Sequence, residues 1–205
     1  MKRHFKVLAL MITVLLGTSS SLCAHSKSGF HDAMRKLWVD HVTWTRLFIV
    51  SAASGNPDTQ ATTQRLLDNQ RDIGNAVADF YGKDAGDKLT ELLREHILLA
   101  ADIVMASKAG DGAKAAKAQK RWYENADEIA VFLHGANPKN WPEATLKSMM
   151  KMHLDQTLAE ATHRLEGKYD QDIKDFDEAL NHILMMADTL SGGIIAQFPK
   201  KFDKA

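Results

Sequence analysis

Residues 88–108 read KLTELLREHILLAADIVMASK, and this stretch decides the fold class. Its apolar residues Leu89, Leu92, Leu99 and Ile103 recur every three or four positions, with His96 in the same row. That spacing places all five side chains on one face of an α-helix, whereas a β-strand would alternate apolar and polar residues. The stretch therefore predicts an amphipathic helix that carries a histidine on its buried face.

Five further segments, on both sides of this stretch, have the same helical period. Glycine- and proline-rich breaks separate them at residues 54–58, 81–86, 109–112, 135–142 and 166–168. Glycine tolerates the left-handed backbone at a helix end, and proline cannot continue a helix. Short links between long amphipathic helices favour antiparallel neighbours. We therefore predict an all-α fold, an up-and-down antiparallel bundle of about six helices.

The N-terminus has the pattern of a secretory signal peptide. Lys2, Arg3 and Lys6 precede an uncharged run at residues 7–17, and a polar stretch with small residues follows. Eleven apolar residues are too few to span a bilayer as a helix. We expect residues 1–24 to be a signal peptide, residues 25–205 to form a single helical-bundle domain, and the protein to be exported.

The composition of the expected mature chain excludes several classes of function. Removal of the three basic residues of the signal would leave 23 basic against 26 acidic residues, a net charge of −3. This balance gives no reason to expect nucleic acid as a partner. No second apolar run suggests a transmembrane anchor after signal cleavage. At most one cysteine remains, so an internal disulfide is excluded and stability must come from packing.

Polar residues recur along the apolar faces at intervals of 27–29 residues. If each helix and its turn take about 28 residues, antiparallel packing places these residues at one height in the bundle. Local similarity between segments also suggests a duplication of two three-helix halves. The recurring residues are His41, Asn69, His96, Asn125, His153 and His182.

Two hypotheses explain this polar layer. In the first, a non-enzymatic bundle binds a metal ion or a small ligand, because bundles build such sites from histidines and carboxylates on facing helices. Zinc, iron or copper would suit these ligands. In the alternative, the layer is structural and fixes helix register, or the bundle serves protein interaction. The candidate metal ligands are His41, His96, His153, His182, Asp72 and Glu128.

Methionines and an acidic triplet add two weaker signals. Met149, Met150 and Met152 precede His153, and Met185 and Met186 follow His182; thioethers would suit copper(I), but methionine as a flexible core residue is the better explanation. Asp170-Gln171-Asp172 spells the Asp-x-Asp triplet of many glycosyltransferases, but acidic residues in the first turn of a helix, which offset its dipole, explain the triplet better. No glycine-rich phosphate loop and no Gly-x-Ser-x-Gly motif occurs, so no catalytic residues are predicted.

Four stretches resemble a family of small exported bacterial helical proteins. They are Trp44–Arg46, Leu67–Gly74, Trp122–Ala130 and His182–Asp188. The resemblance implies a helical bundle over most of the mature chain. Some members carry labels such as glycosyltransferase or acetylglutamate kinase, activities that normally require a nucleotide-binding α/β fold. The resemblance therefore supports the fold and implies no catalytic residues.

Overall fold

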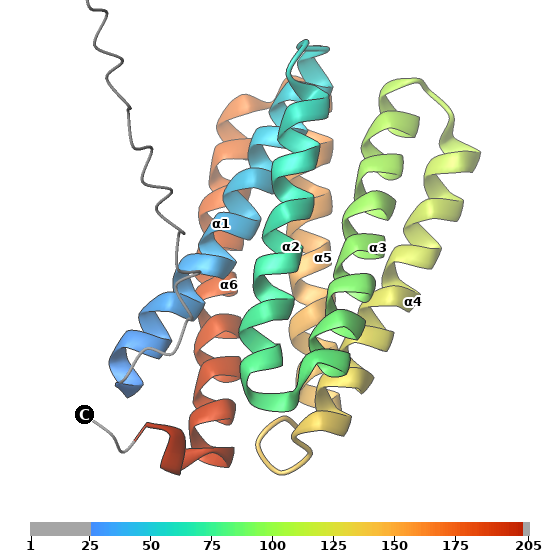
Figure 1. The fold of residues 1–205 in the computed structure, drawn as a ribbon. Helices are drawn as coiled ribbons and strands as arrows, with labels where there is room; N and C mark the ends of the chain where they lie inside the picture. The colour runs from blue at the N-terminus through green and yellow to red at the C-terminus, as the bar shows by residue number, and fades with distance from the viewer. Residues whose placement is uncertain (1–25, 203–205) are drawn as a thin grey trace, which may run out of the picture.

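A computed structural model describes residues 26–202, so the expected signal peptide lies outside the described residues. The described chain is an all-α bundle, which confirms the predicted fold class, and its helix boundaries fall at the predicted breaks (Figure 1). The elements are α1 (Lys27–Ser54), α2 (Thr59–Tyr81), α3 (Lys83–Lys108), α4 (Gly112–Ala136), α5 (Glu143–Leu165), α6 (Tyr169–Gln197) and the short 3₁₀ helix η1 (Pro199–Lys201).

The six helices form a closed ring in chain order. Each helix packs against the next along the chain, and α6 returns to pack against α1. The helices run alternately up and down, and α1 also contacts α3 and α5 across the centre of the bundle. The ring can be described as three antiparallel hairpins: hairpin 1 (α1–α2), hairpin 2 (α3–α4) and hairpin 3 (α5–α6). The first helix of each hairpin therefore lies towards the common centre.

Local sequence chemistry determines where several helices begin and end. The side chain of Ser26 accepts a hydrogen bond from the amide of Gly29 at the start of α1, and Asp111 does the same for Lys114 at the start of α4. Gly55 has φ 71°, the left-handed conformation that closes a helix C-terminus at little steric cost. These ends agree with the breaks predicted from the sequence.

The apolar faces meet in one main core that runs through the bundle. Ile73, Ala130, Leu154, Ile183 and Ile194 are completely buried within it. Full burial of a large aliphatic side chain is worth about 1.5–3 kcal/mol. Packing of this kind holds the rigid scaffold on which the polar layer is built.

Helices α2 and α3 approach closely at a pair of facing glycines. A Cβ atom added to Gly74 would clash with the side chain of Thr90 and lie 2.7 Å from the carbonyl oxygen of Gly86. A Cβ atom on Gly86 would lie 2.6 Å from the carbonyl oxygen of Gly74. Because backbone atoms cannot rotate away, the two helices would have to separate.

We expect Gly74→Ala to lower the free energy of unfolding by about 1–3 kcal/mol, the usual cost of overpacking. Urea denaturation followed by circular dichroism measures it. Gly192→Ala is the matched control, since no atom lies within 4 Å of the added methyl group. The control should be stabilised by about 0.5–1 kcal/mol, as alanine favours the helix. Equal effects at both glycines would contradict the close approach of α2 and α3.

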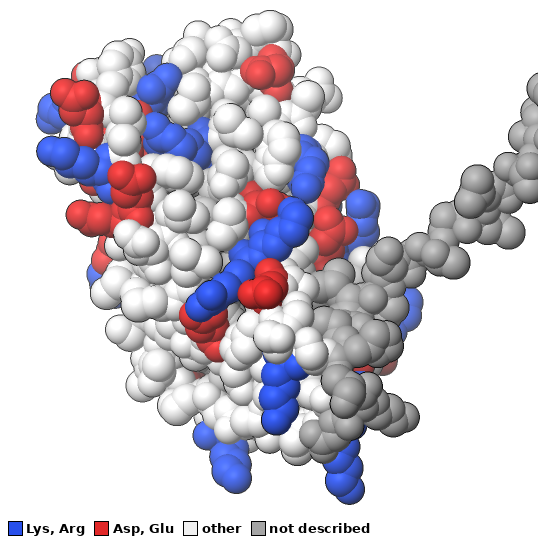
Figure 2. Space-filling model, turned by 90° about the vertical axis from the view of Figure 1, so that its left-hand side faces the viewer, with Lys and Arg blue, Asp and Glu red and all other residues white. Residues whose placement is uncertain are grey.

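The surface carries both signs of charge. On the side shown in Figure 2, where α1 and α6 lie in Figure 1, acidic and basic side chains are mixed and a broad area carries neither. Within residues 26–202, α6 is the one helix long and apolar enough to cross a membrane by length and composition, and 50% of that window is buried in the bundle. Core helices of bundles meet the same criterion.

Candidate functional site

Three histidine rings meet at the centre of the bundle. His41 on α1, His96 on α3 and His153 on α5 are each at most 3% exposed. The ring centroids of His41 and His153 are 5.5 Å apart, and those of His96 and His153 are 6.1 Å apart. Each of the three imidazoles comes from the first helix of its hairpin. Because those helices face the centre of the bundle, the fold itself brings the imidazoles together.

Amide side chains from the second helices hold two of these rings. Asn125 donates through Nδ2 to the carbonyl oxygen of Leu92 at 3.1 Å, which turns its Oδ1 towards Nδ1 of His96 at 3.0 Å. Nδ1 of His96 therefore carries the hydrogen, and Nε2 keeps a free lone pair. In hairpin 1, Nε2 of Gln70 lies 3.2 Å from Nδ1 of His41, which accepts from it.

The same inter-helix hydrogen bond recurs in all three hairpins. A side chain on the second helix donates to a carbonyl oxygen on the first helix, four residues before the central histidine. The three bonds are Asn69 to Leu37 at 3.0 Å, Asn125 to Leu92 at 3.1 Å, and His182 to Met149 at 2.9 Å. The repeating unit is thus a two-helix hairpin present three times, whereas the sequence had suggested two three-helix halves.

Buried polar atoms without hydrogen-bond partners surround the three rings. They include Nδ1 of His153, Nδ1 of His182 and Oε1 of Gln70. The indole nitrogens of Trp38 and Trp122 are also unpartnered, and these indoles lie against His41 and His96 with centroids 5.7 and 5.2 Å away. An unpaired buried polar group costs about 1–3 kcal/mol, and such groups commonly mark a bound water or ion.

The central histidines are neutral at physiological pH. Burial, together with a smaller effect of the neighbouring ring (His96 for His41, and His153 for His96), lowers the pKa of His41 and of His96 to about 3. Burial likewise places the pKa of His153 well below its usual value, with added effects from His41 and His182. Neutral imidazole is the form that binds metal ions.

The two predicted carboxylates do not join the central rings. Glu128 is exposed, and its carboxylate accepts hydrogen bonds from Arg121 at 2.8 and 3.1 Å. Asp72 is half-buried on α2. Three of the six predicted ligands therefore converge, with His182 beside them. Over residues 26–202, no group of three or more histidine, cysteine, aspartate or glutamate side chains is arranged to hold a metal ion.

Two small apolar cavities lie above and below the histidine rings. One is lined by Trp38, Met149 and Met150, the other by Thr45, Trp122 and Thr157, among others, and each holds about 20 Å³. This is about the space of one water molecule, whereas organic ligands need about 300 Å³ or more. Neither cavity is large enough for an organic molecule.

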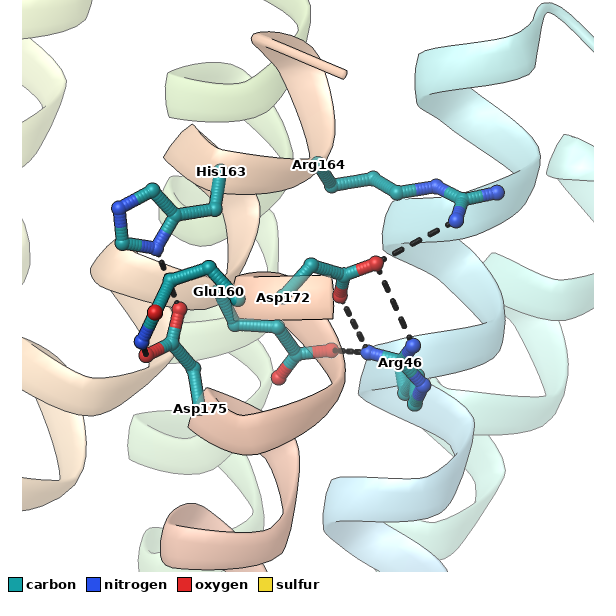
Figure 3. Close-up of polar contacts among 7 residues, drawn as sticks. Arg46, Glu160, His163, Arg164, Asp172 and Asp175 are labelled. Atoms are coloured by element: carbon teal, nitrogen blue, oxygen red, sulfur yellow. Dashed lines mark hydrogen bonds and ion pairs between the residues drawn. The ribbon is translucent and has the colours of Figure 1, made fainter. Parts of the chain in front are cut away.

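A second polar cluster connects α1, α5 and α6 near the C-terminal end of α5 (Figure 3). Nη1 of Arg46 donates to Glu160 at 2.8 Å and to Asp172 at 2.5 Å, and Arg164 also donates to Asp172 at 3.3 Å. Asp172 is completely buried and Glu160 is 2% exposed. Such buried charges persist only because they are paired. We call these residues, with His163 and Asp175, the arginine cluster.

The arginine cluster combines three carboxylates with two guanidinium groups and one imidazole. Three carboxylates, on Glu160, Asp172 and Asp175, face two guanidinium groups, and Nδ1 of His163 lies 2.5 Å from Oδ2 of Asp175. Burial raises the pKa of Glu160 to about 7; Arg46 opposes this rise, and the other two carboxylates add to it. All three carboxylates of the arginine cluster are buried, so the cluster serves to hold α1, α5 and α6 together.

Sequence reasoning did not predict the arginine cluster. Ile173 near the start of α6 is 51% exposed, and Asp172 and Asp175 take the buried face instead. In the Asp170-Gln171-Asp172 triplet, Asp172 therefore does not act only on the helix dipole, because it also accepts hydrogen bonds from Arg46 and Arg164. A signal was present, since Asp172, Asp175 and Ala179 step by three and four into the row of His182.

Comparisons of the chain with protein-family models, with curated proteins and with solved structures find no match. The function must therefore be inferred from the central histidines and their surroundings.

Proposed function

We propose that this protein is an exported, non-enzymatic bundle that binds one transition-metal ion through His41, His96 and His153. The observation that carries the proposal is the convergence of three neutral, buried imidazoles from three parallel helices. Three histidines with an open fourth position are a common ligand set for zinc and related ions. Unpartnered polar atoms around the rings support an occupant at this place.

Binding requires small side-chain rearrangements. The imidazoles must turn towards one point, because no three of them already form a ligating group within residues 26–202. His41 must also move its hydrogen from Nε2 to Nδ1. A turn of the Gln70 amide would present its unpartnered Oε1 to that hydrogen, the arrangement that Asn125 already has with His96.

Thermal unfolding with Zn²⁺ and Co²⁺ tests the proposal. A ligand that binds only the folded state at 100 times its Kd adds about 2.7 kcal/mol. For a domain of this size the melting temperature should rise by about 5–10 °C. Co²⁺ also reports coordination directly through its visible absorption. Failure of the metal-free protein to respond to either ion would overturn the proposal.

His96→Gln identifies the site. The variant keeps a polar side chain near Asn125 but removes the imidazole lone pair, so the metal-dependent rise should vanish. His134→Gln is the control, because His134 lies in the last turn of α4 and bonds to the carbonyl oxygen of Trp141. This control should keep the full rise.

A structural role is the second candidate, and the three recurring inter-helix bonds favour it. Buried polar side chains on helix faces can fix register, and here each hairpin has one bond from such a side chain to a carbonyl oxygen of its partner helix. In this case His96→Gln would change stability by the same amount with and without metal. The same melting experiment therefore separates the two candidates.

A further inference from the structure

Hairpin 3 differs from the other two hairpins in one consistent way. Equivalent positions in the three hairpins are found by aligning the first helices on their central histidines and the second helices on the residues that make the recurring inter-helix bonds. Where hairpins 1 and 2 carry leucine, tryptophan, isoleucine or a carboxylate, hairpin 3 carries methionine. The five methionines are Met149, Met150, Met152, Met185 and Met186.

Two of these methionines replace surface carboxylates. Met152 corresponds to Asp40 and Glu95, and Met185 corresponds to Asp72 and Glu128. Met152 is 48% and Met185 56% exposed, although methionine is usually buried. In hairpin 2 the two equivalent positions share one partner, because Glu95 and Glu128 both pair with Arg121 at 2.7 and 2.8 Å. The correspondence therefore places Met152 and Met185 on one face of hairpin 3.

The remaining changes lie in the interior, beneath that face. Met149, Met150 and Met186 line the cavity of about 20 Å³ beside the central rings. His182 stands where hairpins 1 and 2 have Asn69 and Asn125. Like those asparagines it bonds across the hairpin, but Nδ1 of His182 and Nδ1 of His153 are left buried without partners.

We propose that hairpin 3 makes the metal site selective for a soft monovalent cation of the Cu⁺ type. Thioethers and imidazoles together bind Cu⁺ well, whereas carboxylates favour harder ions. Met152 and Met185 receive the ion at the surface, and His182 and His153 supply nitrogen ligands inside. The inference rests on the proposed function, since it names the class of ion that the central layer binds.

Silver(I) is the probe, because it has the same charge and ligand preference as Cu⁺ and does not change oxidation state. Ag⁺ titrations of the full chain in nitrate buffer, followed by calorimetry, give its Kd, and Zn²⁺ is titrated in parallel. Met152→Leu with Met185→Leu should weaken Ag⁺ binding at least tenfold and change Zn²⁺ binding less than twofold. Met105→Leu is the matched control, as Met105 on hairpin 2 is 47% exposed and should have no effect.

A second variant tests the interior ligand. His182→Asn installs the residue of the other two hairpins, so the bond to the carbonyl oxygen of Met149 is retained and the fold should persist. Ag⁺ binding should again fall at least tenfold, while Zn²⁺ binding to the three central histidines continues. Methionine methyl resonances give an independent readout: those of Met152 and Met185 should shift when Ag⁺ is added, and that of Met105 should not.

The outcomes separate this inference from the function on which it rests. If Zn²⁺ or Co²⁺ binds through His96 but Ag⁺ binds no more tightly, or if neither the methionine pair nor His182 affects Ag⁺, the soft-ion inference is overturned and the metal site stands. If no ion binds the unmodified protein, both are overturned. Loss of Ag⁺ binding in both variants, with Zn²⁺ binding intact, supports the inference.

Discussion

Replacing Arg46 by methionine should lower the free energy of unfolding by about 3–5 kcal/mol at pH 8. Nη1 of Arg46 donates hydrogen bonds to both Glu160 and Asp172, and both carboxylates are almost completely buried. Its guanidinium group also lies over the ring of Phe176, 4.9 Å from the ring centre. Methionine keeps much of the apolar stem, so the loss reports the uncompensated carboxylates. Urea denaturation of both proteins measures it.

The penalty should shrink as the pH falls. The folded-state pKa of Glu160 is about 7, above its unfolded value, so below pH 7 Glu160 takes up a proton and needs Arg46 less. Arg35→Met is the control, because Arg35 makes a similar two-bond pair with Asp188 at the surface, where solvent screening leaves such pairs little effect on stability. A similar loss in both variants, or one independent of pH, would contradict a buried arginine cluster.

Acid should destabilise the metal-free protein through the central histidines. Their folded-state pKa values lie far below the unfolded value of about 6.5, so below pH 6.5 the unfolded chain binds protons that the folded chain does not. Stability is therefore full above pH 6.5 and decreases as the pH falls. Three histidines together should cost about 4 kcal/mol between pH 7.5 and pH 5.5.

Glu160 acts in the opposite direction over the same range. Its raised pKa makes the folded state bind an extra proton below pH 7, which adds about 2 kcal/mol by pH 5.5. The net loss in the unmodified protein should be about 2 kcal/mol. In Glu160→Gln, which cannot take up this proton, the loss should approach 4 kcal/mol.

Denaturant unfolding at a series of pH values measures both slopes. Adding His153→Gln to the Glu160→Gln protein serves as the comparison, since removing one of the three buried rings should make the acid slope of that protein shallower by about a third. A stability independent of pH between 7.5 and 5.5 in Glu160→Gln would show that the three rings are solvated or paired with a carboxylate.

The helices and the central histidines could be predicted from the sequence because both follow from spacing. The row from Leu89 through His96 to Ile103 has one period only, and the glycine breaks fix where each helix ends. Once the helices are antiparallel and of similar length, residues 27–29 positions apart must lie at one height. The rings of His41, His96 and His153 lie together at one height, and His182 is buried beside them.

The partners of those residues could not be predicted, since they depend on how helices rotate about their axes. Glu128 lies on the same helix as Asn125 and one turn away, yet a small rotation leaves it with Arg121 at the surface. The face of α6 that carries Asp172 and Asp175 competed with the more apolar face of Ile173. On the buried face Asp172 pairs with Arg46, which is 126 residues away in the chain.

Because the helices form a closed ring, the fold depends little on which hairpin the chain begins with. The start of α1 and the end of the described chain lie together, since the rings of Phe30 and Phe202 are 5.3 Å apart. Each hairpin also makes its own inter-helix bond and supplies its own central histidine. The contacts of the bundle are therefore nearly indifferent to which hairpin comes first. A circular permutation that links residue 202 to residue 26 and opens the chain between two hairpins would keep every helix beside the same two neighbours.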